Sequence, residues 1–273
     1  MSKKPAPYQR QVTVSGSLLL PFGSTKKWEL DRIRLQYAST SGLHFTSDVP
    51  FVHINKRAKR PLYFNDAPAI FNMPKLFRGV DGDKDERKKI ILMRIKNAVS
   101  QFMEGATKYE HLFLDHYFAH FLDSYDYEVE YTDFVGDKAQ APLWMSGLLP
   151  IPQVQIYCED PLDKRFSAAP SNNFRVDFGF WTGKELVAVE VDGYEPSGYE
   201  RDLRRDRMLR RAGVDLVHIL NKELEEHGRR VITKLLPGTV MNTYYSSLTN
   251  EEREGASFYL YASSSDLDDE IPF

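Results

Sequence analysis

The chain has 273 residues, of which 42% are hydrophobic and 13% are aromatic, and this apolar content excludes a disordered protein. Its formal net charge is −3, but residues 1–100 carry 19 Lys and Arg against 8 Asp and Glu, whereas residues 101–273 carry 17 against 31. Such an asymmetry is typical of proteins with a nucleic-acid or membrane partner. The single cysteine excludes an internal disulfide framework and favours a reducing compartment.

The sequence contains no pattern typical of a membrane span or a secretory signal. It has no run of about 18 apolar residues, and the opening residues MSKKPAPYQR lack the apolar core of a signal peptide. We therefore expect a cytoplasmic protein without a membrane partner. No particular oligomeric state is predicted.

Residues 1–80 are predicted to form a β-rich, basic region that binds nucleic acid or has an accessory role. Short strand-like runs occur at residues 11–20, 28–38 and 50–54. A basic cluster lies among aromatic residues, which suits contact with a nucleic-acid backbone. Its members, the first candidate DNA-binding residues, are Lys56, Arg57, Lys59 and Arg60. The alternative is a solvated face beside a small β core.

Helical and strand patterns alternate after residue 80. Acidic residues ahead of an apolar repeat predict a connecting helix over residues 81–105. Further helices are expected over residues 106–122, 198–212 and 222–236, with strands at 127–131, 153–157, 174–181, 185–192 and 215–220. Mixed strands flanked by helices predict an α/β sandwich around one sheet within residues 106–240. Residues 241–262 would form a C-terminal extension.

Three carboxylates lie in a predicted hairpin whose two strands meet at a Thr-Gly turn. Because side chains alternate along a strand, Glu190 and Asp192 share one face, and the hairpin brings Asp177 near Glu190. Clustered carboxylates repel each other unless a cation neutralises them, and oxygen ligands on rigid strands suit Mg²⁺ or Mn²⁺. The alternative is a hairpin whose acidic side chains face solvent.

Six motifs follow one another in order between residues 106 and 236. They are Glu110, Pro152-Gln153-Val154, Arg175-Val176-Asp177-Phe178, Val189-Glu190-Val191-Asp192-Gly193, Asp202-x2-Arg205-Asp206-x2-Leu209-x3-Gly213 and the strand at 215–220. In this order the segment resembles the restriction-endonuclease-like PD-(D/E)XK nucleases, and within them the branch similar to the very-short-patch-repair endonuclease. The resemblance implies a restriction-endonuclease-like mixed sheet flanked by helices and a metal-dependent DNA endonuclease that hydrolyses phosphodiester bonds.

The same resemblance implies roles for four candidate catalytic carboxylates. Asp177 and Glu190 would bind the metal ion together with the backbone carbonyl of Val191, and Glu110 would be a further ligand or would position water. Asp192 stands where the superfamily often has a lysine, so its carboxylate could act as a general base or bind a second cation. The number of metal ions stays open. A tyrosine replaces the histidine that often follows this motif, which puts a histidine-assisted leaving-group step in doubt.

Six arginines lie in the helix predicted over residues 198–212. Arginine binds phosphate oxygens in a bidentate manner, and we expect Arg201 and Arg204 to contact DNA. By the family pattern, Arg205 and Asp206 would have structural roles. Intrahelical ion pairs are the alternative for the arginines of this helix.

Residues 263–273 are predicted to form an acidic, disordered tail. The sequence SDLDDEIPF resembles the acidic tail of bacterial single-stranded-DNA-binding proteins. An aromatic plug with neighbouring acids suits an apolar pocket with a basic rim. The residues expected to make this contact are Asp268, Asp269, Ile271, Pro272 and Phe273. The resemblance implies a replication or repair protein as the partner, and a generic acidic tail is the alternative.

Taken together, these patterns predict a metal-dependent DNA endonuclease that its tail recruits to replication or repair proteins. Two alternatives differ in what the nuclease-like segment does. The first is a non-catalytic single-stranded-DNA-binding or recruitment protein that uses this segment as a scaffold. The second is the strand-cutting endonuclease subunit of a transposase.

Overall fold

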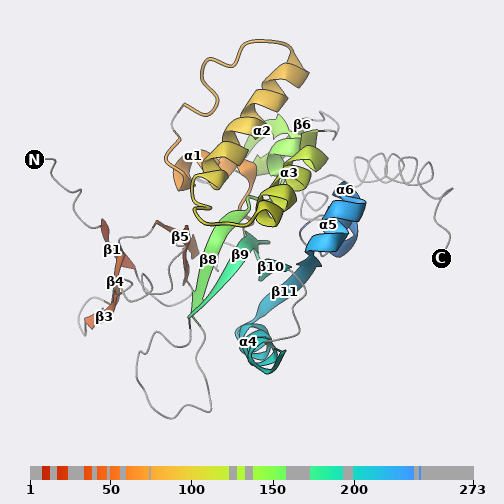
Figure 1. The fold of residues 1–273 in the computed structure, drawn as a ribbon. Helices are drawn as coiled ribbons and strands as arrows, with labels where there is room; N and C mark the ends of the chain where they lie inside the picture. The colour runs from red at the N-terminus through yellow and green to blue at the C-terminus, as the bar shows by residue number, and fades with distance from the viewer. Residues whose placement is uncertain are drawn as a thin grey trace, which may run out of the picture.

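The protein has a mixed α/β fold in which helices flank a four-stranded mixed sheet (Figure 1). The computed structural model describes residues 8–12, 17–23, 34–38, 42–47, 50–55, 60–73, 75–122, 128–132, 138–157, 173–192, 199–236 and 240. No helix among these residues has the length and apolar character needed to cross a bilayer.

The central sheet has the strand order β11-β10-β9-β8. Its strands are β8 (Ile151–Tyr157), β9 (Asn173–Trp181), β10 (Leu186–Asp192) and β11 (Val214–Leu220). The pairs β8–β9 and β9–β10 are antiparallel, whereas β10 and β11 are parallel. Parallel strands need a crossover, which contains helix α4 (Tyr199–Arg211). The four strands and the helix predicted here are confirmed, with ends that differ by at most two residues.

Two helices precede the central sheet in the chain. They are α2 (Lys84–Ser100) and α3 (Lys108–Leu122), and both confirm the predicted helices. Asp83 is the N-cap residue of α2, and its side chain accepts a hydrogen bond of 2.9 Å from the Glu86 amide. Helix α3 packs against α2 and against β10, so it covers the apolar side of the hairpin.

The helix predicted over residues 222–236 is wrong in one respect, because two helices occupy this segment. Helix α5 (Asn221–His227) and helix α6 (Arg229–Leu235) meet at Gly228. Gly228 has a φ of +52°, a left-handed conformation that glycine adopts without strain. A Cβ at this position would lie 3.2 Å from the ring of His116 in α3, so the break allows close packing on that helix.

The N-terminal region contains more strands than predicted. They are β1 (Tyr8–Val12), β2 (Ser17–Pro21), β3 (Arg34–Ala38), β4 (Gly42–Ser47) and β5 (Phe51–Asn55). The single strand predicted over residues 11–20 is wrong, because β1 joins the sheet β1-β4-β3 whereas β2 pairs with β5. The strand at 50–54 is confirmed, β3 confirms the end of the strand at 28–38, and β4 was not predicted.

Shorter elements connect these layers. A 3₁₀ turn η3 (Phe64–Asp66) leads into α1 (Ala67–Ile70), and a second 3₁₀ turn η4 (Leu143–Ser146) precedes β8. Strand β6 (Glu128–Thr132), which was predicted, pairs with the unpredicted β7 (Lys138–Pro142).

Backbone hydrogen bonds tie the N-terminal region to the central sheet. The Gly23 amide donates to the Pro152 carbonyl at 3.2 Å, and the Leu62 amide donates to the Trp181 carbonyl at 3.1 Å. The indole of Trp181 donates in turn to the carbonyl of Arg60 at 2.9 Å. Buried side chains of β2, β5, α2, α3 and the sheet form one hydrophobic cluster. Residues 17–23, 50–55 and 60–73 therefore share a core with α2, α3 and the central sheet.

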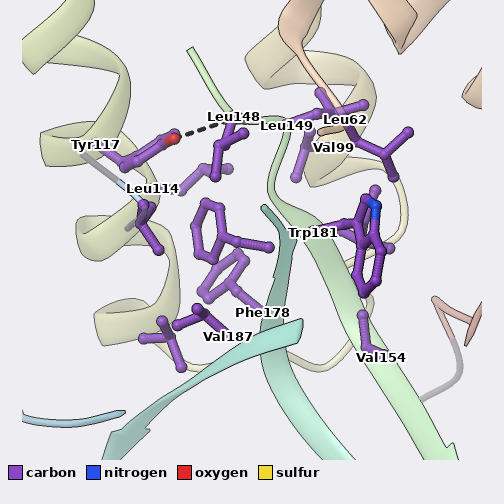
Figure 2. Packing of buried hydrophobic residues seen from close by; sticks show 14 of the residues in the cluster. Leu62, Val99, Leu114, Tyr117, Leu148, Leu149, Val154, Phe178, Trp181 and Val187 are labelled. Atoms are coloured by element: carbon purple, nitrogen blue, oxygen red, sulfur yellow. Dashed lines mark hydrogen bonds between the residues drawn. The ribbon is translucent and has the colours of Figure 1, made fainter. Parts of the chain in front are cut away.

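Aromatic side chains fill the space between α3 and the hairpin (Figure 2). Phe113 of α3 lies 4.8 Å from the ring of Phe178, and Tyr117 lies 5.2 Å from Phe180. The buried Tyr117 hydroxyl donates a hydrogen bond of 2.7 Å to the Leu148 carbonyl, which Figure 2 shows as a dashed line. Because buried polar groups are costly to leave unpaired, this hydrogen bond holds the Tyr117 ring at its position in the core.

Replacing Tyr117 with phenylalanine should destabilise the protein by about 1–2 kcal/mol, because the Leu148 carbonyl would lose its buried donor. Urea unfolding followed by circular dichroism measures the change. Tyr109→Phe is the matched control, since Tyr109 is only partly buried and should cost less than about 0.5 kcal/mol. Equal costs for the two variants would contradict this account of the core.

Candidate functional site

The carboxylate of Asp177 lies where the ladder between β9 and β10 stops. The last paired residues of that ladder are Phe178 and Val189. One step further, the Val191 amide donates a hydrogen bond of 2.8 Å to Oδ2 of Asp177. A side-chain oxygen therefore accepts the amide hydrogen of the neighbouring strand, which fixes the carboxylate beside β10.

The surroundings of Asp177 disfavour its negative charge. Burial raises its pKa from 3.8 to about 7, and the nearby charges of Glu110 and Asp192 add to this effect. The Val191 amide and the charge of Arg175 act in the opposite direction and do not cancel it. Three of the predicted carboxylates, Asp177, Glu110 and Asp192, are thus close enough in the structure to interact electrostatically.

Glu190 lies in a strand that is buried on both faces. Its side chain is only 7% exposed, so the alternative of a solvent-facing acid does not hold for this residue. Arg205 of α4 forms an ion pair with Oε1 of Glu190 and donates to the Arg175 carbonyl at 3.2 Å. These contacts give Arg205 the structural role that we predicted.

Glu110 lies in the first turn of α3 and caps that helix. The Thr107 amide donates to Oε1 of Glu110 at 2.9 Å, and the Glu110 amide donates to the Thr107 hydroxyl at 3.3 Å. Oε2 accepts a hydrogen bond of 2.5 Å from the side-chain amide of Gln153 in β8. Glu110 is 6% exposed, so it is buried with both oxygens engaged.

Gln153 is a site residue to which sequence reasoning assigned no role. It has a φ of +50°, which is unusual for a residue other than glycine, and its side chain is 2% exposed. Such backbone strain is found where the surrounding structure requires it. Here the conformation places the amide of Gln153 on Glu110. The Pro-Gln-Val motif contained this residue, but no sequence signal gave its backbone angle.

Asp192 has a partner that the sequence did not reveal. Nδ1 of His218 lies 2.8 Å from Oδ2 of Asp192, and Nε2 lies 3.2 Å from Oδ2 of Asp206. His218 belongs to β11, where it is the register partner of Glu190. The hydrogen bond to Asp192 is the largest cause of a raised pKa for His218. Only the pairing of β10 with β11 brings these residues together.

The candidate DNA-binding residues lie partly outside the described residues, as Lys56, Arg57 and Lys59 do. Arg60 forms a bidentate pair with Asp66, with both distances at 2.9 Å. Because Asp66 is only 4% exposed, this pair has a structural role, and a DNA contact by Arg60 stays a prediction.

The two arginines predicted to face DNA belong to α4. Arg204 is exposed, whereas the side chain of Arg201 lies outside what the structure describes. The candidate tail residues lie outside it as well, and they are Asp268, Asp269, Ile271, Pro272 and Phe273.

Within the described ranges, no three side chains of His, Cys, Asp or Glu are placed so as to hold a metal ion. Glu190 contacts Arg205, and Asp192 contacts His218. Comparison with protein-family models, curated proteins and solved structures finds no match for this chain. Any functional assignment therefore rests on the geometry of the site.

Replacing Asp177 with asparagine should stabilise the metal-free protein at pH 8 by about 1–3 kcal/mol. The folded protein holds the Asp177 proton up to about pH 7, whereas the unfolded chain releases it near pH 4. The stability that this proton contributes is complete below pH 4 and is lost as the pH rises through 7. The gain of Asp177→Asn should therefore shrink to zero by pH 4.

Urea unfolding in the presence of EDTA across this pH range measures the difference between the two proteins. Asp215→Asn is the control, because Asp215 is exposed on β11. A constant difference from pH 4 to pH 8 would show that Asp177 is not held in a disfavoured, charged state.

Proposed function

We propose that the protein is a metal-dependent DNA endonuclease with a restriction-endonuclease-like fold. The observation that carries this proposal is the Asp177 carboxylate, bound by the Val191 amide at 2.8 Å within reach of the charges of Glu110 and Asp192. A carboxyl group whose pKa is raised by burial and by two neighbouring carboxylates is an arrangement that a cation would stabilise.

The order of the elements supports the proposed fold. Helix α3, strands β8, β9 and β10, helix α4 and strand β11 follow one another in the chain. These elements carry the six motifs of the PD-(D/E)XK resemblance in the same order. The four-stranded mixed sheet between helices agrees with what that resemblance implies.

The donor groups fit Mg²⁺ or Mn²⁺, which prefer oxygen ligands. Asp177, Glu190 and the Val191 carbonyl would hold the ion, with water and a substrate phosphate as further ligands. The proposed site uses only two side chains and one main-chain oxygen. It is therefore compatible with the finding that no three acidic, His or Cys side chains among the described residues are placed to hold a metal ion. Arg205 forms an ion pair with Oε1 of Glu190 and would have to release this oxygen before it could bind the ion.

When bound, the ion would polarise the scissile phosphate and lower the pKa of a bound water. The oxygen of the attacking water forms a bond to phosphorus, and the bond from phosphorus to the leaving oxygen breaks. Asp192 would accept the proton of the attacking water, and the leaving oxygen takes up a proton from solvent. Glu110 would orient the water, and Arg201 and Arg204 would contact the flanking phosphates.

One observation favours a second candidate function, a non-catalytic DNA-binding or recruitment protein. Arg205 already offsets the charge of Glu190, and the side-chain amide of Gln153 already donates a hydrogen bond to Glu110. A scaffold that binds no metal would show the same contacts. The two functions differ in whether DNA is cut and in whether Mg²⁺ binds to the purified protein.

The purified protein should cut DNA with Mg²⁺ or Mn²⁺ but not with EDTA, in a panel of single-stranded, duplex and branched substrates. Asp177→Asn and Glu190→Gln should each lower the rate by about 100-fold or more, because each removes a proposed metal ligand. Gel-resolved cleavage of end-labelled DNA measures the rates.

Asp215→Asn is the matched control, since it makes the same change of charge on an exposed part of β11, and it should cut at the unaltered rate. Intact substrates throughout the panel would contradict the endonuclease. Tight DNA binding that Asp177→Asn leaves unchanged would then support the non-catalytic alternative.

We also propose that the acidic segment at residues 265–273 recruits a replication or repair protein that binds the tails of single-stranded-DNA-binding proteins. Removing Phe273 should weaken this binding by about tenfold or more, because an aromatic anchor often dominates such contacts. Fluorescence anisotropy with a labelled tail-binding protein measures the affinity. Ser264→Ala is the control, and equal affinity of the protein lacking Phe273 would contradict the proposal.

A further inference from the structure

A histidine on β11 links two carboxylates at the edge of the proposed site. The two ring nitrogens of His218 lie 2.8 Å from Oδ2 of Asp192 and 3.2 Å from Oδ2 of Asp206. Asp192 ends β10, whereas Asp206 belongs to α4. The imidazole therefore connects the strand that carries the candidate carboxylates to the arginine-rich helix.

We propose that His218 is a positioning residue that holds Asp192 in the orientation needed to accept a proton from the attacking water. This inference rests on the proposed endonuclease function. A ring that is bound at both nitrogens has no freedom to rotate, so Asp206 fixes His218 and His218 fixes Asp192. Because the hydrogen bond uses Oδ2 of Asp192, Oδ1 is the oxygen that would meet the water.

The position of His218 in the sheet explains why it can take this role. It is the register partner of Glu190 in the parallel pair of β10 and β11, so its backbone is as well fixed as that of the candidate ligands. Its side chain is 37% exposed, and exposure alone would leave an imidazole several rotamers. The two carboxylates remove that freedom.

His218→Ala should lower kcat for DNA cleavage with Mg²⁺ by about 10- to 100-fold, which is the usual cost of losing a group that orients a site residue. KM should change by less than about threefold, because the proposed role concerns the reaction rather than DNA binding. His218→Asn should recover part of the lost rate, because its amide can still donate to Asp192. Asp206→Asn should cause a smaller loss, and combining it with His218→Ala should add little.

His227→Asn is the matched control, because His227 is exposed at the end of α5, a helix that carries none of the proposed site residues, and it should leave kcat unchanged. Unfolding midpoints show whether each variant is folded, and His218→Asn carries the test if the alanine variant is not. A kcat of His218→Ala equal to that of the unaltered protein, a loss confined to KM, or equal rates for the Ala and Asn variants would overturn this inference. An unaltered protein that cuts no DNA would instead overturn the proposed function.

Discussion

Repulsion between neighbouring carboxylates has to be offset within the fold itself, because Glu190 is buried and Asp177 is partly buried. The structure gives each of the four candidate carboxylates a different partner. The pairs are Asp177 with the Val191 amide, Glu190 with Arg205, Glu110 with Gln153 and the Thr107 amide, and Asp192 with His218. The compensation is incomplete at Asp177, whose pKa stays raised to about 7. This residual cost is the physical basis for expecting a cation there.

These partners come from four separate elements, so the arrangement depends on the order of the sheet. Gln153 reaches the site from β8, Arg205 from α4 and His218 from β11. Because β10 is central, it contacts β9 on one side and β11 on the other, and a group on either neighbour can approach its carboxylates. A strand at the sheet edge would lack one of these two sources. The mixed topology therefore matters to the site as well as to the core.

The sequence was sufficient to predict the hairpin at residues 173–192, because two apolar strand-like runs joined by a Thr-Gly turn are compatible with few structures other than a β-hairpin. It was insufficient for the contacts that surround the carboxylates. Glu110 and Gln153 are 43 residues apart, and Asp192 and His218 are 26 apart, so only strand register and a left-handed φ bring them together. The break at Gly228 was also hidden, because the apolar repeat continues across it. Local patterns predict elements, whereas these features arise from packing between distant elements.

The hydrogen bond from the Gly23 amide to the Pro152 carbonyl lies directly before the strained Gln153. A Cβ at Gly23 would lie 2.9 Å from the ring of Phe102, so Gly23, just after β2, packs between Phe102 and β8. This part of the N-terminal region thus supports the strand that carries Gln153. In evolutionary terms, recombination that exchanged residues 106–240 between related genes without residues 17–66 would separate β8 from its support, and the two segments are expected to be inherited as a unit.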